Sequence, residues 1–137
     1  MRFFSPGQIT MLGGSRGLAP IGEGENIMSY YLYQLTYSKE AIKAMVTNPT
    51  DREAAARKLI EALGGKLHHL FFAFGQYDVI CLAEASDDKV MMACAAAVAS
   101  AGTVSGSSTI KLMTSSDAMA AMAMAGKATG SYKAPQA

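Results

Sequence analysis

The chain has 137 residues, half of them apolar, and a formal net charge of +1. These values are typical of one folded domain with a substantial core, and they exclude an intrinsically disordered chain. A charge this close to zero supplies no basic field for nucleic acid, and no apolar run reaches the length of about 18 residues that a membrane span needs. The two cysteines, Cys81 and Cys94, are expected to be buried free thiols of a cytoplasmic protein.

Residues 1–27 differ from the rest of the chain. The segment is rich in glycine and follows neither the period of a strand nor that of a helix. Two interpretations are open: a start assigned upstream of the true one, or a flexible arm that docks on a neighbouring molecule. The compact domain is therefore expected at residues 28–126, and residues 127–137 are expected to form a frayed polar tail.

The domain begins with an aromatic-rich run. Residues 30–37 predict a first strand, because tyrosine and leucine at alternating positions suit a pleated, half-buried surface. Ser38 then offers its hydroxyl as the N-cap of a helix over residues 39–46.

A break and a restart follow in the helical region. Asn48-Pro49 ends the first helical piece, because proline disfavours the helical conformation in the residue before it. Thr50 and Glu53 have the spacing of a capping box, which predicts that a second helical piece begins there. Gly64-Gly65 predicts its end.

Two apolar runs within residues 66–85 indicate a hairpin around Gly75-Gln76. Glycine at the first loop position predicts a two-residue type II′ turn, because only glycine takes a positive φ there without strain. In this register Phe74 lies opposite Tyr77, so Gly75 and Tyr77 are the structural residues of the turn. Tyr77 is then expected to be a core aromatic.

The rest of the chain supplies a helix over residues 89–101, a strand over 104–113, and a short last helix capped by residues 115–117. The element order is β-α-β-β-α-β with an extra C-terminal helix. This order predicts a ferredoxin-like α+β domain, in which both crossovers place their helices on one face of an antiparallel sheet.

Both faces of the hairpin are mostly apolar. One face is expected to carry His68, Leu70, Phe72, Phe74, Tyr77, Val79 and Cys81, and the opposite face His69, Phe71, Ala73, Asp78, Ile80 and Leu82. The helices of one domain can cover only one of them, and soluble monomers rarely expose a large apolar patch. We therefore expect self-association of the uncovered faces, which would form a dimeric α/β barrel.

Several segments agree in order and spacing with a known family. They include Ser-Lys-Glu-x-Ile-Lys at 38–43, Asn-Pro-Thr-Asp-Arg at 48–52, and Gly-Gln-Tyr-Asp at 75–78. Over residues 29–126 the chain resembles the GYD-domain proteins, which are named for a Gly-x-Tyr-Asp motif at this hairpin. The resemblance implies a dimeric α/β barrel and brings no established biochemical activity with it.

Asp78 is the polar residue with the clearest chemical potential. In a partly closed barrel its carboxylate could accept a proton, and otherwise it would accept backbone amides and fix the hairpin. Gln34, Thr36 and His69 are expected to share its face and to line any ligand cavity there, or else to lie in a packed interface. His68 is expected on the face opposite His69, so no metal site is predicted, and no cofactor.

Three functions are compatible with these features. The first is a homo-oligomeric module that binds a small ligand or a protein partner at the barrel face. The second is a cofactor-free enzyme that uses Asp78 as acid or base, which rests on analogy of fold alone. The third is a structural subunit whose residues 1–27 tie it into a larger assembly.

Overall fold

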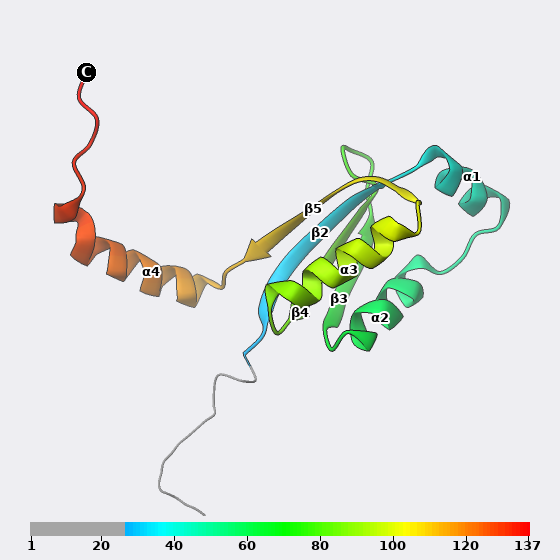
Figure 1. Ribbon diagram of the computed structural model, residues 1–137, viewed down its shortest axis with the longest axis horizontal. Helices are drawn as coiled ribbons and strands as arrows, with labels where there is room; N and C mark the ends of the chain where they lie inside the picture. The colour runs from blue at the N-terminus through cyan, green and yellow to red at the C-terminus, as the bar shows by residue number, and fades with distance from the viewer. Residues whose placement is uncertain (1–26) are drawn as a thin grey trace, which may run out of the picture.

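A computed structural model describes residues 27–137, and the structural statements below refer to these residues. Nearly all of the segment predicted to be an N-terminal extension lies outside them. In chain order the elements are β2 (Ser29–Tyr37), α1 (Lys39–Thr47), α2 (Arg52–Ala62), β3 (Lys66–Phe72), β4 (Val79–Ala85), α3 (Asp88–Ser100), β5 (Val104–Leu112), α4 (Ser115–Ala128) and the 3-10 helix η2 (Thr129–Ser131) (Figure 1).

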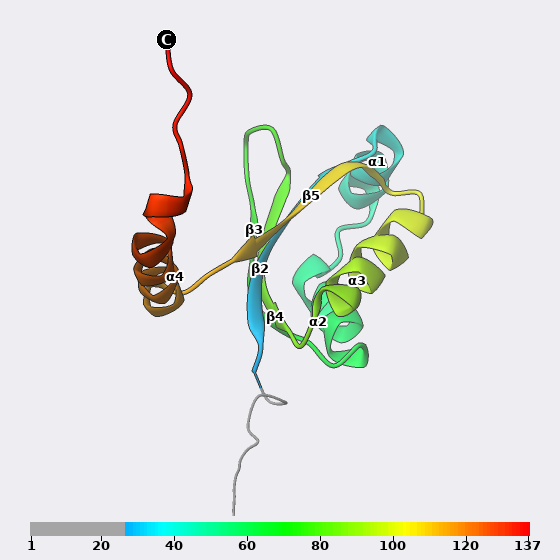
Figure 2. The same cartoon turned by 60° about the vertical axis from the view of Figure 1, so that its left-hand side comes forward.

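The four strands form one antiparallel sheet in the order β3-β4-β2-β5. Two consecutive strands, β3 and β4, form a hairpin, while the first strand lies between β4 and the last strand. This is the ferredoxin-like α+β arrangement that the sequence predicts. Helices α2 and α3 lie on the same side of the sheet (Figure 2).

The core lies between these helices and the sheet. Alternate residues of each strand point toward the helices, as the period of two requires. The core residues are Tyr31, Tyr33 and Leu35 of β2, Leu67 of β3, Val79, Cys81, Ala83 and Ala85 of β4, Ile60 of α2, and Met91 and Cys94 of α3.

The opposite side of the sheet is covered by neither α2 nor α3 (Figure 2), and we call it the open face. Its residues follow from the strand register: Tyr30, Leu32, Gln34 and Thr36 of β2, His69 and Phe71 of β3, Ile80, Leu82 and Glu84 of β4, and Ser108, Ile110 and Leu112 of β5. Phe71 is 63% exposed and Ile110 is 44% exposed. The predicted apolar character of the second face of the hairpin is found in Phe71, Ile80 and Leu82, which all lie on the open face.

The helix caps are partly those predicted. Ser38 caps α1, since its hydroxyl accepts the Ala41 N–H at 3.1 Å. The N-cap of α2 is Asp51, whose carboxylate accepts the Ala54 N–H, so the capping box predicted from Thr50 is wrong by one residue. The chain stays extended through Asp51, and a carboxylate there also suits the positive end of the helix dipole.

The hairpin loop differs from the predicted turn. The Ala73 N–H donates to the Asp78 carbonyl at 2.9 Å, so residues 74–77 form the loop. The positive-φ glycines are Gly64 and Gly102, so Gly75 does not form a type II′ turn, and that prediction is wrong. Phe74 is fully exposed and does not pack on a half-buried Tyr77. A residue of β2 contacts the loop, because Thr36 Oγ1 donates a hydrogen bond to the Gln76 carbonyl at 2.9 Å.

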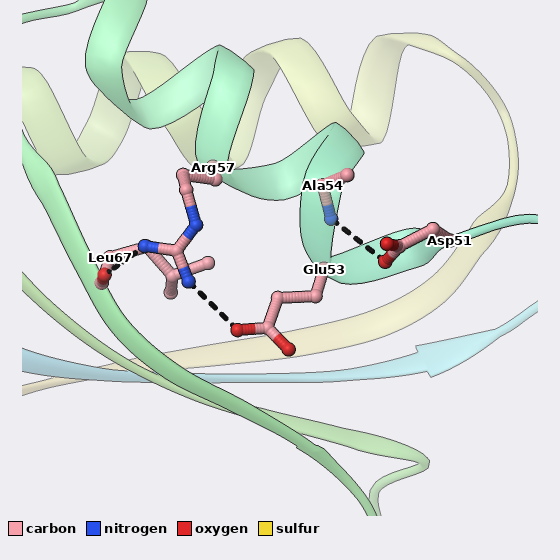
Figure 3. A network of polar contacts seen from close by, with 5 residues as sticks. All are labelled: Asp51, Glu53, Ala54, Arg57 and Leu67. Carbon is pink, nitrogen blue, oxygen red and sulfur yellow. Dashed lines mark hydrogen bonds and ion pairs between the residues drawn. The ribbon is translucent and has the colours of Figure 1, made fainter.

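A β-bulge at His68 interrupts the β3–β4 ladder. Leu67 pairs with Ala83 and His69 with Leu82, which leaves His68 as the extra residue. Arg57 of α2 donates to the Leu67 carbonyl at 2.6 Å and pairs with Glu53 at 2.8 Å (Figure 3). The bulge therefore lies where a helix side chain supplies a hydrogen bond to the strand backbone.

Helix α4 lies apart from the domain. It extends on the side of the sheet opposite α2 and α3 (Figure 2), and it has no buried residue. It begins after the N-cap Thr114, one residue before the predicted cap, and it continues beyond residue 126 to Ala128. Within the described part of the chain, no helix is long and apolar enough to cross a membrane.

Candidate functional site

The open face presents its side chains in cross-strand rows. One row runs through His69, Leu82, Leu32 and Ile110, and the next through Phe71, Ile80, Gln34 and Ser108. Gln34 thus lies in a largely apolar surface, one row from His69, and Thr36 lies two residues further along β2. The register places the predicted ligand residues Gln34, Thr36 and His69 on one face of the sheet.

Asp78 lies at the base of the hairpin, beside the end of β2. Its Oδ2 accepts the Tyr37 N–H at 2.9 Å, and its own N–H donates to the Leu35 carbonyl at 2.8 Å. These two bonds join the hairpin to β2 where the regular ladder ends. Tyr77 and Gly75 precede Asp78 in the same loop. The observed contacts of the carboxylate are those of a structural group that satisfies a strand-end amide.

The two histidines lie on the same face, contrary to the prediction. Because the bulge inserts His68 into the strand, the simple alternation of faces fails at this point. His68 Nε2 contacts Glu84 Oε2 of the open face, and its ring lies 5.8 Å from that of Tyr30. The His69 ring stacks on Phe71 at 5.7 Å. The described residues contain no group of three or more side chains suited to holding a metal ion.

Tyr31, Asp88 and Lys111 form a polar cluster on the helix side of the sheet. The sequence does not predict this cluster. Tyr31 donates to Asp88 Oδ1 at 2.7 Å, and the Lys111 ammonium lies 3.1 Å from the same oxygen. Burial, together with this hydrogen bond, raises the pKa of Tyr31 to about 12. Tyr31 and Lys111 are cross-strand partners, so the cluster becomes visible only with the β2–β5 register. It ties the start of α3 to the sheet.

Cys81 and Cys94 are both free and buried in the core, as expected. Burial raises the pKa of Cys81 to about 11, with a smaller contribution from the Glu53 carboxylate, and burial also raises the pKa of Cys94. Nucleophilic chemistry of cysteine needs the thiolate. Neither thiol is therefore suited to act as a nucleophile at neutral pH.

The family model of the GYD domain matches residues 31–122, which is most of the chain and spans every strand of the sheet. The chain belongs to the GYD domain family. None of the curated proteins matches its sequence.

The solved structures that match this GYD domain share little sequence with it. They include the crystal structure of MtbAldR, with 14% identity, a TM-score of 0.44, and coverage of 63% of this chain and 52% of that one. A homoserine dehydrogenase from Thiobacillus denitrificans has 20% identity, a TM-score of 0.43, and coverage of 70% and 20%. A protein of unknown function from Nitrosomonas europaea has 19% identity, a TM-score of 0.39, and coverage of 64% and 92%. The GYD domain thus spans about half of the first of these chains and a fifth of the second.

Replacing Asp78 by alanine should destabilise the GYD domain by about 1.5–3 kcal/mol, because the Tyr37 N–H loses a charged acceptor at a half-buried position. Urea denaturation of the wild type and the variant measures this loss. The matched control is Asp117→Ala, which removes an exposed carboxylate from the first turn of α4 and should change stability by less than about 1 kcal/mol. Equal stability of Asp78→Ala and the wild type would contradict the structural role of this carboxylate.

The free energy of unfolding should also fall as the pH rises from about 9 to about 11, because Cys81 holds its proton more tightly in the folded state. The stabilisation is complete below the pKa of the unfolded thiol and is lost as the pH passes through the folded value. We expect Cys81 to account for about 2 kcal/mol. Urea denaturation at both ends of this range measures the change.

Lysines and tyrosines titrate in the same range, so the pH experiment needs a matched variant. Cys81→Val keeps an apolar side chain of similar size and removes the titrating thiol. Its stability should fall less than that of the wild type over the same pH interval. Identical slopes for the two proteins would show that the Cys81 pKa is not raised.

Proposed function

We propose that this GYD domain is a homo-oligomeric binding module in which the open face packs against the open face of a second copy. The proposal is supported mainly by the apolar character of that face, where Leu32, Ile80, Leu82 and Ile110 form a continuous surface across three strands. Burial of such a surface is worth about 25 cal/mol per Å². Within one chain, the sheet buries only its helix-facing side.

Helix α4 supports the same proposal independently. Met119, Met122 and Met124 are each about 70% exposed, and the helix carries few charges among its alanines and methionines. A helix of 14 residues is only marginally stable in water without tertiary packing, and one that is apolar all round is normally buried. Helix α4 extends on the side of the open face (Figure 2), and in the proposed dimer it would pack on the partner copy.

In such a dimer, Gln34, Thr36 and His69 would lie between the two sheets. They would provide a few polar groups in an otherwise apolar surface, which is the composition of a small-ligand site or of a satisfied interface. The carboxylate of Asp78 has a backbone amide as its partner, and this favours a binding module over an enzyme that uses Asp78 as acid or base. The third function, assembly through an N-terminal arm, concerns residues outside the described range.

Sedimentation velocity of the full chain over a range of concentrations tests the proposal. We expect a dimer, and we expect Met119→Glu/Met122→Glu to weaken it by at least about tenfold, because the two carboxylates would be buried on the partner. Met92→Glu is the matched control: Met92 on α3 is as exposed as Met122 but faces away from the proposed contact. A wild type that sediments as a monomer at all concentrations would overturn the proposal.

A further inference from the structure

A cavity of about 130 Å³ lies on the opposite side of the sheet, between the sheet and helices α2 and α3. It is separate from the open face and from the proposed contact between copies. The residues that form its inner wall include Ile60, Val79, Cys81, Met91 and Cys94, all of them buried. Protein interiors are otherwise close-packed, and a void of this size lowers stability unless something fills it.

One tyrosine, Tyr33, contributes to the wall of the cavity, and its hydroxyl is enclosed by neighbouring protein atoms. Tyr33 is 8% exposed and contributes to the lining, and its hydroxyl oxygen has no hydrogen-bond partner among the described residues. The Ser107 hydroxyl on β5 is near enough to lower part of the rise that burial causes in the Tyr33 pKa, but the two hydroxyls do not meet the distance and angle of a regular hydrogen bond. Buried polar groups without partners are rare and each has a cost.

Three residues form the end of the cavity that is nearest to solvent. Arg52 at the start of α2, Tyr37 at the end of β2, and Thr103 before β5 contribute to the lining and are less buried than the inner wall. The guanidinium of Arg52 donates to Thr50 Oγ1 at 3.3 Å, so it already has a partner at the surface. The cavity therefore opens between α2 and the α3–β5 connection and becomes apolar with depth.

We propose that this cavity binds a small uncharged molecule of six to eight non-hydrogen atoms that carries one hydrogen-bond acceptor, which receives the hydroxyl proton of Tyr33. The size follows from comparison with an apolar protein cavity of about 150 Å³ that holds benzene. Charge is excluded by the inner wall, because an unpaired ion buried there would be strongly disfavoured. A cyclic ketone has the required shape and acceptor. The Tyr33 hydroxyl is itself enclosed by neighbouring atoms, so contact requires a small shift of its ring.

The test uses cyclohexanone and benzene as probes of the full ¹⁵N-labelled chain. Both ligands should shift the amide resonances of residues around the cavity, such as Ile60 and Cys94, in a saturable way. Tyr33→Phe retains the ring and removes the donor, so it should weaken cyclohexanone binding by about two- to tenfold and change benzene binding by less than about twofold. This difference separates a hydrogen bond from simple filling of space.

A second variant closes the cavity. Ala56→Leu, on the part of α2 that lines the cavity, should abolish binding of both probes, whereas Ala54→Leu on the exposed side of the same helix should leave binding unchanged. The absence of saturable shifts in the wild type would overturn the proposal. So would an equal response of the two probes to Tyr33→Phe, or tighter binding of benzoate than of cyclohexanone, which would place the ligand at Arg52. None of these outcomes depends on self-association, which sedimentation measures separately.

Discussion

Leu82→Arg should convert the proposed dimer of this GYD domain to a monomer, with an affinity between copies at least about 100-fold lower. Leu82 lies on the open face in the central strand β4, between Leu32 of β2 and His69 of β3. Sheet-to-sheet packing would bury the new guanidinium without a partner, and an unpaired buried charge costs several kcal/mol. In the separate chain the same side chain reaches water, so the fold itself should be retained. Sedimentation velocity gives the affinity, and far-ultraviolet circular dichroism checks the fold.

Leu63→Arg is the matched control for this experiment. Leu63 is the C-cap residue of α2, 36% exposed and on the helix side of the molecule, far from the open face. The same substitution there should leave the association unchanged. If Leu82→Arg dimerised as tightly as the wild type, the copies could not meet through this part of the sheet.

Leu67→Ala should have the largest effect on the stability of the single chain, a loss of about 3 kcal/mol in the free energy of unfolding. Leu67 is 1% exposed and is one of the two largest side chains that are fully buried. It lies directly before the bulge, in the core between the sheet and the helices, where its removal would leave a void. Urea denaturation measures the loss.

The comparison for Leu67 is Leu63→Ala, which removes the same atoms from a partly exposed position four residues earlier. We expect it to lower the free energy of unfolding by less than about 1 kcal/mol, in proportion to the smaller area withdrawn from water. Similar losses for the two variants would mean that Leu67 is not at the centre of the core. Each variant removes one leucine, so a difference between their free energies of unfolding reflects the burial of the side chain.

The element order and the two-faced sheet follow from the sequence because they depend on local periodicity. The buried residues Tyr31, Tyr33 and Leu35 of β2 alternate with less buried residues of the other face, and Ser38 caps α1 with its own hydroxyl. Once the β-α-β-β-α-β order is established, sheet geometry dictates that β2 lies beside β4. The register then predicts correctly that Gln34 and Thr36 lie on the open face.

The features that the sequence does not predict depend on contacts between distant residues. The bulge at His68 coincides with the hydrogen bond that Arg57 donates to the Leu67 carbonyl, and no local pattern marks it. The loop after Phe72 is held by Thr36 and Asp78 rather than by the conformation of Gly75. The cavity beside Tyr33 likewise depends on the distance between the helices and the sheet, which composition does not determine.

The bulge has a further consequence for how chains can meet. The strand order places β3 at one edge of the sheet, where unpaired backbone groups could recruit a strand from another molecule. An extra residue in the middle of that edge disturbs the regular spacing of donors and acceptors, so a straight strand cannot add to it along its full length. At the other edge, the first half of β5 contains a glycine among several serines, and this part has little intrinsic preference for further pairing. Growth of the sheet into a fibre is thus disfavoured at both edges, and contact through the faces is the route that the architecture leaves open.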